Sequence, residues 1–204
     1  KNIMSKIVEL RQTDTKLNLE NIEDKFSKII SSDEWGKLQD AYNKSTNVFM
    51  FGHGGNMAVA DHAAVDSSRL TNKNIIAPGS GIVATSLIAD SSFNDWIKNW
   101  VKQSSRGLDL KNSLAIGFSC SLGNASSNAI MTALNYCDDI GIKSALISAQ
   151  YKPMGNSDVI KVVQNVELYH TSEILSLALT YQLIHGAGFN CPSIIKKSKN
   201  KESQ

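Results

Sequence analysis

The stretch Leu114-Ala115-Ile116-Gly117-Phe118-Ser119-Cys120-Ser121-Leu122-Gly123-Asn124 decides the fold of this chain. Its first five residues carry no polar side chain, as in a strand buried on both faces, and the loop that follows leads into a helical stretch. A second loop, Phe51-Gly52-His53-Gly54-Gly55-Asn56, has the same context. Small residues let a backbone approach a ligand closely, and free N–H groups at a helix N-terminus hold an anion. Two such loops predict a site for a phosphorylated small molecule.

Around these loops, short apolar runs alternate with helical stretches. Strands are predicted at 48–51, 74–77, 114–118, 143–148 and 159–163, and helices at 56–70, 91–103, 126–138 and 171–186. Such alternation implies an α/β fold with a parallel sheet that is covered by helices on both faces. Ligands of these folds bind at the carboxyl ends of the strands, where both loops fall.

The first 45 residues predict an N-terminal helical arm. Apolar residues recur there at helical spacing, and Ser32 is placed to cap a helix that begins near residue 33. Because such an arm needs another surface to pack on, we interpret residues 1–45 as an oligomerisation element. Residues 46–190 then form the ligand-binding domain, and 191–204 a basic, flexible tail.

Bulk composition narrows the class of protein. The 204 residues carry 21 basic and 19 acidic side chains, a near balance that argues against a nucleic-acid partner. The three cysteines are widely spaced and form no zinc or disulfide pattern, which favours a reducing compartment. No apolar run reaches the length of a membrane span, and no signal peptide is visible. We therefore expect a cytoplasmic protein without a membrane partner.

The motifs resemble those of the sugar isomerase (SIS) domain family, in particular its phosphoheptose isomerase group. The matching segments are Gly52–Asn56, His62 with Asp66, Ala89–Phe93, Ser119–Asn128 and the helix Thr171–His185. The resemblance implies a flavodoxin-like three-layer sandwich with a five-stranded parallel sheet. It also implies a homotetramer with active sites at subunit interfaces. The implied reaction converts sedoheptulose 7-phosphate to D-glycero-D-manno-heptose 7-phosphate, which supplies heptose for surface polysaccharide.

The same resemblance implies the site residues. Asp66 stands where the family has its catalytic glutamate, with His62 four residues earlier on the same helix face. The family's zinc-binding Gln and His are matched to Ser172 and Thr180, so a zinc site would keep only His62 and Asp66. The residues expected to bind substrate or phosphate are Gly54, Gly55, Asn56, Asp90, Ser119, Cys120, Ser121, Ser126 and Ser172.

Simpler interpretations of these residues stay open. Ser119 and Ser121 can cap the next helix, and Asp66 can pair with Arg69 on the surface. Further metal ligands would have to come from another subunit, with His53, His170, Glu173 and His185 as possible donors. Three functions remain: an aldose–ketose isomerase, a sugar-phosphate-binding protein without turnover, and a relative that binds a replication-initiator protein.

Overall fold

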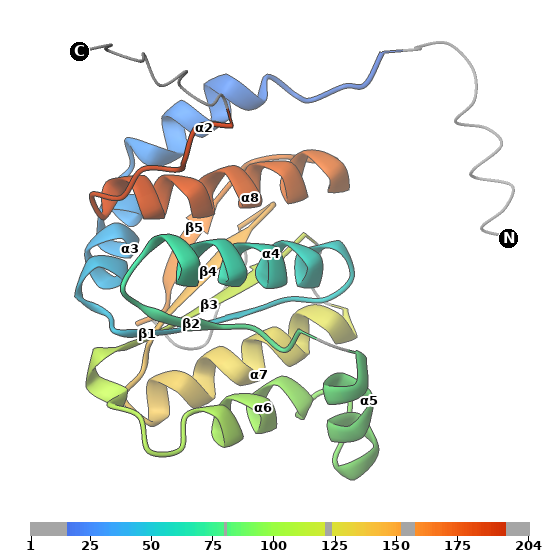
Figure 1. Cartoon of the computed structure of the whole chain (residues 1–204). Coiled ribbons are helices and arrows are strands. Elements are labelled where there is room, and N and C mark those ends of the chain that lie inside the picture. Colours follow the sequence, from blue (N-terminus) through green and yellow to red (C-terminus); the bar gives the residue numbers. More distant parts are fainter. Residues whose placement is uncertain (1–15, 80, 121–123, 152–157, 195–204) are drawn as a thin grey trace, which may run out of the picture.

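The chain folds around a single parallel sheet (Figure 1). A computed structural model describes residues 16–79, 81–120, 124–151 and 158–194. The five strands lie in the order β2-β1-β3-β4-β5, and each pairs in parallel with its neighbours. Their bounds are β1 (Asn47–Phe51), β2 (Asn74–Ile76), β3 (Ser113–Ser119), β4 (Lys143–Ser148) and β5 (Ile160–Val163). The predicted α/β fold class is confirmed.

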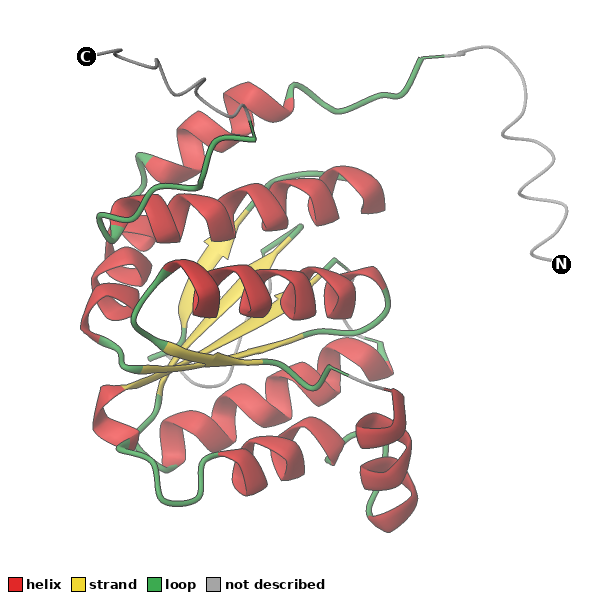
Figure 2. Cartoon of the chain, viewed as in Figure 1, coloured by secondary structure: helices red, strands yellow, loops and turns green. Residues whose placement is uncertain are grey.

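Helices cover both faces of the sheet, which makes three layers (Figure 2). One face carries α2 (Ile22–Ile30), α3 (Asp33–Lys44), α4 (Gly55–Leu70) and α8 (Tyr169–Gly186). The other carries α5 (Gly81–Asp90), α6 (Trp96–Ser104) and α7 (Ala125–Asp139), and the short 3-10 helix η1 (Leu110–Asn112) precedes β3. None of the helices in the described ranges is long and apolar enough to cross a membrane.

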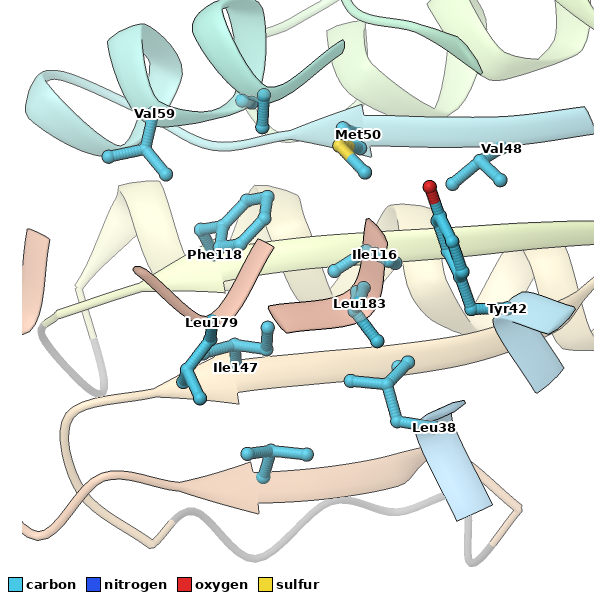
Figure 3. Close-up of a cluster of buried hydrophobic side chains, with 14 of the residues drawn as sticks. Leu38, Tyr42, Val48, Met50, Val59, Ile116, Phe118, Ile147, Leu179 and Leu183 are labelled. Atoms are coloured by element: carbon cyan, nitrogen blue, oxygen red, sulfur yellow. The ribbon is translucent and has the colours of Figure 1, made fainter. Parts of the chain in front are cut away.

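Two hydrophobic cores follow from the alternation of side chains along each strand. Val48 and Met50 of β1 pack toward α4 and α8 in the first core, which also takes in Leu38 and Tyr42 of α3 (Figure 3). The intervening Phe49 and Phe51 join Trp96, Ile97 and Trp100 of α6 in the second core, as do buried residues of α7. Because both faces are buried, every residue of β1 and β3 is buried, as the unbroken apolar runs predict.

The strand order places a topological switch between β1 and β3. From β1 the chain forms β2 on one side and then returns across β1 to form β3 on the other. Phe51 lies opposite Gly117 in the register, so β1 and β3 run side by side toward their carboxyl ends. Helices α4 and α7, which follow these strands, leave toward opposite faces of the sheet (Figure 1). A crevice opens at such a point, and ligands of doubly wound sheets bind there.

Most predicted elements are present, with two differences. The helix predicted at 91–103 begins only at Trp96, because Ser92 and Asp95 form a hydrogen-bonded turn before it. Helix α5 was not predicted, since its apolar residues surround the helix and leave no one-sided stripe. Ser32 caps α3 as expected, accepting from the Trp35 N–H at 3.2 Å. Residues 1–15 of the predicted arm and 195–204 of the tail lie outside the described ranges.

Candidate active site at the carboxyl ends of β1 and β3

A cavity of about 270 Å³ lies at the switch point between β1 and β3. Segments far apart in the sequence line it: the β1–α4 loop, the end of β3, the start of α7 and the start of α8. The lining residues are His53, Gly54, Gly55, Asn56, Phe118, Ser119, Cys120, Asn124, Ser126, Ile130, Tyr169 and Glu173. The structure thus brings the two loops that were singled out from the sequence to one cavity.

The tight β1–α4 loop needs glycine at two positions, Gly52 and Gly54. A Cβ on Gly52 would lie 2.7 Å from the main-chain oxygen of Asn56. Gly54, the residue before α4, has a φ of 58°, which a side chain would strain. Asn56 is buried, and its Nδ2 donates to Sγ of Cys120 at 3.1 Å, which ties this loop to the end of β3. The loop therefore presents the first turn of α4 to the cavity.

The N-terminus of α7 provides the part of the cavity best suited to an anion. Asn124 caps this helix, and its Oδ1 accepts from the Ser127 N–H at 2.9 Å. The half-buried Ser126, in the first turn, and Ser119, at the end of β3, also line the cavity. First-turn N–H groups without helical partners bind phosphate readily, with hydroxyls as additional donors. Ser121, also predicted to bind phosphate, lies outside the described residues.

His53 is held in a fixed orientation in the cavity wall. Its Nε2 lies 3.0 Å from the indole Nε1 of Trp96, and its ring stacks on Phe93 at a centroid distance of 5.0 Å. Indole N–H groups only donate, so Nε2 is the acceptor and the proton of the neutral ring sits on Nδ1. Burial lowers the pKa of His53, and the Ser126 main chain opposes this effect. His53 is therefore neutral near pH 7.

Glu173 extends from α8 over the first residue of α4. A Cβ built on Gly55 would lie 2.1 Å from Oε1 and 2.4 Å from Oε2 of Glu173, so the carboxylate is in direct contact with the helix start. Helix N-termini stabilise carboxylates through their N–H groups and dipole. The sequence indicated Glu173 only as one of several possible metal ligands. Glu173 reaches Gly55 because α8 packs beside α4.

Asp66 and His62 of α4 form a second cluster with Tyr181 of α8. The Tyr181 hydroxyl donates to Oδ2 of Asp66 at 2.5 Å, and His62 Nε2 lies 3.3 Å from the same oxygen. Arg69 Nη2 donates to the other oxygen, Oδ1, at 2.8 Å. The Tyr181 hydrogen bond is the main reason that the pKa of Asp66 is lowered. The same bond raises the pKa of Tyr181 to about 12.

This cluster lies outside the cavity. Tyr181 is eight residues beyond Glu173, about 12 Å along a helix, and neither Asp66 nor His62 lines the cavity. The surface pairing of Asp66 with Arg69 that the sequence allowed is present. The role of Asp66 and His62 as a catalytic pair stays a prediction.

The described residues of a single chain do not form the full donor set of the zinc ion that the family resemblance implies. Among the described residues, no group of three or more His, Cys, Asp or Glu side chains is placed to hold a metal. The Asp66 oxygens already accept from the protonated Tyr181 phenol and from Arg69, whose positive charge opposes a cation. Structural zinc sites need four ligands and catalytic ones three from the protein.

Several other predicted residues face away from the cavity. Ser172 is buried, and its Oγ donates to Oε1 of Gln164 at 2.6 Å. Thr180 is buried as well and donates to the Leu177 carbonyl. On α8 it is therefore the next residues, Glu173 and Tyr181, that project toward α4.

Two further predicted residues are also remote. Asp90 is exposed at the end of α5 and does not line the cavity. His170 Nε2 lies 2.8 Å from the Asn18 carbonyl oxygen, so this ring is engaged with the segment before α2.

Comparison with known proteins supports the fold. No family model and no curated sequence matches the chain. Among solved structures, phosphoheptose isomerases of Neisseria gonorrhoeae and Francisella tularensis align with TM-scores of 0.66 and 0.64 at 14% and 13% identity. The alignments cover 91% and 92% of this chain and 96% and 98% of those chains. The Vibrio vulnificus NanR protein, complexed with ManNAc-6P, aligns with 0.59 at 13% identity over 83% of this chain and 59% of its own.

These likenesses define the class of fold. The chain has the α/β sandwich of the phosphosugar isomerases and other SIS-domain proteins, as the sequence resemblance implied. The alignments with the two phosphoheptose isomerases span nearly the whole of both chains.

Proposed function

We propose that the chain is an aldose–ketose isomerase of phosphorylated sugars, of the phosphoheptose isomerase type. The observation that carries this proposal is the cavity at the switch point, where an anion-binding helix start, a neutral histidine and a carboxylate meet. The substrate proposed is sedoheptulose 7-phosphate and the product D-glycero-D-manno-heptose 7-phosphate. This product would serve the synthesis of surface-polysaccharide heptose.

The chemistry matches what the cavity contains. Aldose–ketose isomerisation moves a proton between two adjacent carbons and needs a base at the C–H bond and a donor at the carbonyl oxygen. The start of α7, with Ser119 and Ser126, would hold the phosphate. Because the described lining residues include no Lys or Arg, N–H groups, amides and hydroxyls must supply this binding.

A homo-oligomer, a tetramer by the family resemblance, is part of the proposal. Val65 on α4 and Ile174 on α8 are 65% and 46% exposed, and they lie on the two helices that carry Asp66 and Tyr181. A second copy of this chain that packed on Val65 and Ile174 would shield from solvent the region next to the cavity. The three cysteines are free, which fits the reducing cytoplasm that we propose as its compartment.

The direct test is proton exchange. The purified protein is incubated with sedoheptulose 7-phosphate in D₂O, and loss of the C1 proton signal is followed by NMR. Exchange reports enediol formation even when little product accumulates. We expect exchange together with thermal stabilisation by the sugar phosphate. If this sugar gave no exchange and no thermal stabilisation, the result would contradict the proposed substrate.

A second candidate function is a sugar-phosphate-binding protein without turnover. The observation that favours it is the engagement of Asp66, the family's catalytic position, by Tyr181 and Arg69. NanR, a structural neighbour, is complexed with ManNAc-6P. This candidate predicts thermal stabilisation by a sugar phosphate with no exchange of carbon-bound protons.

A further inference from the structure

A histidine and a carboxylate line the cavity, and neither belongs to the pair that was expected from the sequence. His53 comes from the β1–α4 loop and Glu173 from the second turn of α8, and both line the space that Ser119 and Ser126 border. Asp66 does not line this space. The acid–base groups nearest to a sugar whose phosphate lies at the α7 N-terminus are therefore His53 and Glu173.

The tautomer of His53 makes its Nδ1–H a hydrogen-bond donor. Trp96 donates to Nε2, which leaves the proton of the neutral ring on Nδ1. Nδ1 is buried and forms no hydrogen bond of good geometry with a described residue, although the Ser126 main chain lies beside the ring. Stacking on Phe93 fixes the plane of the ring. A buried donor without a partner is costly, and a ligand oxygen in the cavity would satisfy it.

The carboxylate of Glu173 is a hydrogen-bond and proton acceptor at the same cavity. Its carboxylate lies against Gly55 at the start of α4, on an otherwise uncharged lining. This position differs from that of Asp66, whose two oxygens accept from Tyr181 and Arg69. A carboxylate that already accepts strong hydrogen bonds on both oxygens is a poor base for carbon. Among the described residues that line the cavity, Glu173 has no comparable cationic partner.

We propose that Glu173 is the base that moves the proton between carbons in this isomerase, and that His53 donates its Nδ1–H to the substrate carbonyl oxygen. The inference rests on the proposed function. Glu173 takes the proton from the carbon beside the carbonyl, and the C–H electron pair forms the double bond of an enediolate. The adjacent hydroxyl proton moves to the new oxyanion, which His53 stabilises. Glu173 then returns its proton to the neighbouring carbon, so that the enzyme ends unchanged.

The experiment compares two carboxylate variants of the full chain, Glu173→Gln and Asp66→Asn. Exchange of the C1 proton of sedoheptulose 7-phosphate is measured for each, together with thermal stabilisation by the same sugar. A general base contributes about 10²- to 10⁴-fold. Glu173→Gln is expected to slow exchange by about that factor and to keep or strengthen binding, because it removes a negative charge near the phosphate. Asp66→Asn is expected to slow exchange less than about 10-fold.

Two further variants test the geometry. Glu173→Asp keeps the charge but shortens the reach, and it should also lose exchange if the carboxylate acts on carbon. His53→Phe keeps the stacking on Phe93 and removes the donor, and it should lower kcat by about 10²- to 10³-fold, as the loss of an oxyanion donor does.

The outcomes separate the inference from the proposed function. Exchange that survives Glu173→Gln but disappears in Asp66→Asn would overturn the inference and leave the isomerase proposal standing. No exchange in the parent protein with sedoheptulose 7-phosphate, fructose 6-phosphate or ribulose 5-phosphate would overturn both. Loss of exchange in Glu173→Gln alone, with binding kept, supports both.

Discussion

The indole Nε1 of Trp96, in the second core, donates a 3.0 Å hydrogen bond to Nε2 of His53, in the cavity wall. The two rings are inclined at 76° to one another. Trp96 is 1% exposed, so this bond joins a residue of the core to a residue of the cavity. It determines which ring nitrogen of His53 carries the proton, and it thereby connects the packing of α6 to the chemistry of the β1–α4 loop.

Replacing Trp96 by Phe should change the tautomer of His53. Without the indole N–H as a donor to Nε2, the proton of the neutral His53 ring can sit on either nitrogen. Only part of the population then carries it on Nδ1. We expect a mixed tautomer in ¹⁵N NMR spectra and a fall in kcat larger than the change in KM. The lost hydrogen bond and contact should cost about 1–2 kcal/mol of stability.

Trp100→Phe is the matched control for Trp96→Phe. Trp100 is also buried in α6, but it packs edge-on against Phe49 and Phe51 and has no His53 contact. It should lose stability and keep the His53 tautomer. Equal NMR effects of the two variants would show that general loosening of α6, rather than the hydrogen bond, moves the ring.

Gly55→Ala should separate activity from stability. Its new Cβ would meet the Glu173 carboxylate within 2.4 Å, and a flexible side chain can swing away at little cost. Alanine is also the better helix former, by about 1 kcal/mol in a helix interior. We therefore expect an unchanged or higher melting temperature together with reduced proton exchange.

Gly36→Ala supplies the comparison for Gly55→Ala. A Cβ at Gly36 of α3 meets nothing within 4 Å, so this variant should raise stability by about 0.5–1 kcal/mol and leave exchange unchanged. Full activity in Gly55→Ala would contradict a role for the position of Glu173.

Tyr181 should ionise late in an alkaline titration. Its hydrogen bond to Asp66 raises its pKa to about 12 from an ordinary 10.0. Because the native pKa is the raised one, the stability contributed by this bond is present below pH 10 and is lost as the pH rises through about 12. Ultraviolet difference titration of the parent against Tyr181→Phe should show one late-ionising phenol missing in the variant.

Asp66 supplies the acid-side counterpart of the Tyr181 prediction. The pKa of Asp66 is lowered by Tyr181 first and by His62 and Arg69 as well, while burial opposes. Its contribution to stability is thus present above the ordinary aspartate pKa and is lost as the pH falls through the lowered native value. Asp66→Asn should flatten this part of the acid denaturation curve and bring the ionisation of Tyr181 to lower pH. An unchanged Tyr181 titration would contradict the bond.

Gly117→Ala should destabilise the sheet where α7 packs against β3, and its new Cβ would crowd Ile130 in the cavity wall. A Cβ there would lie 2.8 Å from Cγ2 of Ile130 and 3.3 Å from Leu134 and Phe51, since α7 approaches β3 closely at this residue. Overpacking of this kind costs about 1–3 kcal/mol, which chemical denaturation would measure. A fully stable variant would show that the spacing between α7 and β3 is loose.

The sequence by itself determined the sheet and the place of the site. Short unbroken apolar runs such as 114–118 are typical of strands buried on both sides, and the loops that follow strands 48–51 and 114–118 then lie at the carboxyl edge of a parallel sheet. Local signals also placed the Ser32 cap, because caps depend on residues only three positions apart, whereas the cap of α7 is Asn124 and was not predicted.

Only the tertiary structure decided which side chains meet. Asp66 and Arg69 are one turn apart, and their pairing was visible in the sequence, but Tyr181 reaches Asp66 from 115 residues away. Trp96 and Glu173 likewise reach His53 and Gly55 only because α6 and α8 pack beside the β1–α4 loop. A rotation of one residue on α8, about 100° in a helix, exchanges Ser172 for Glu173 at the cavity. Packing sets that rotation, and a sequence motif does not.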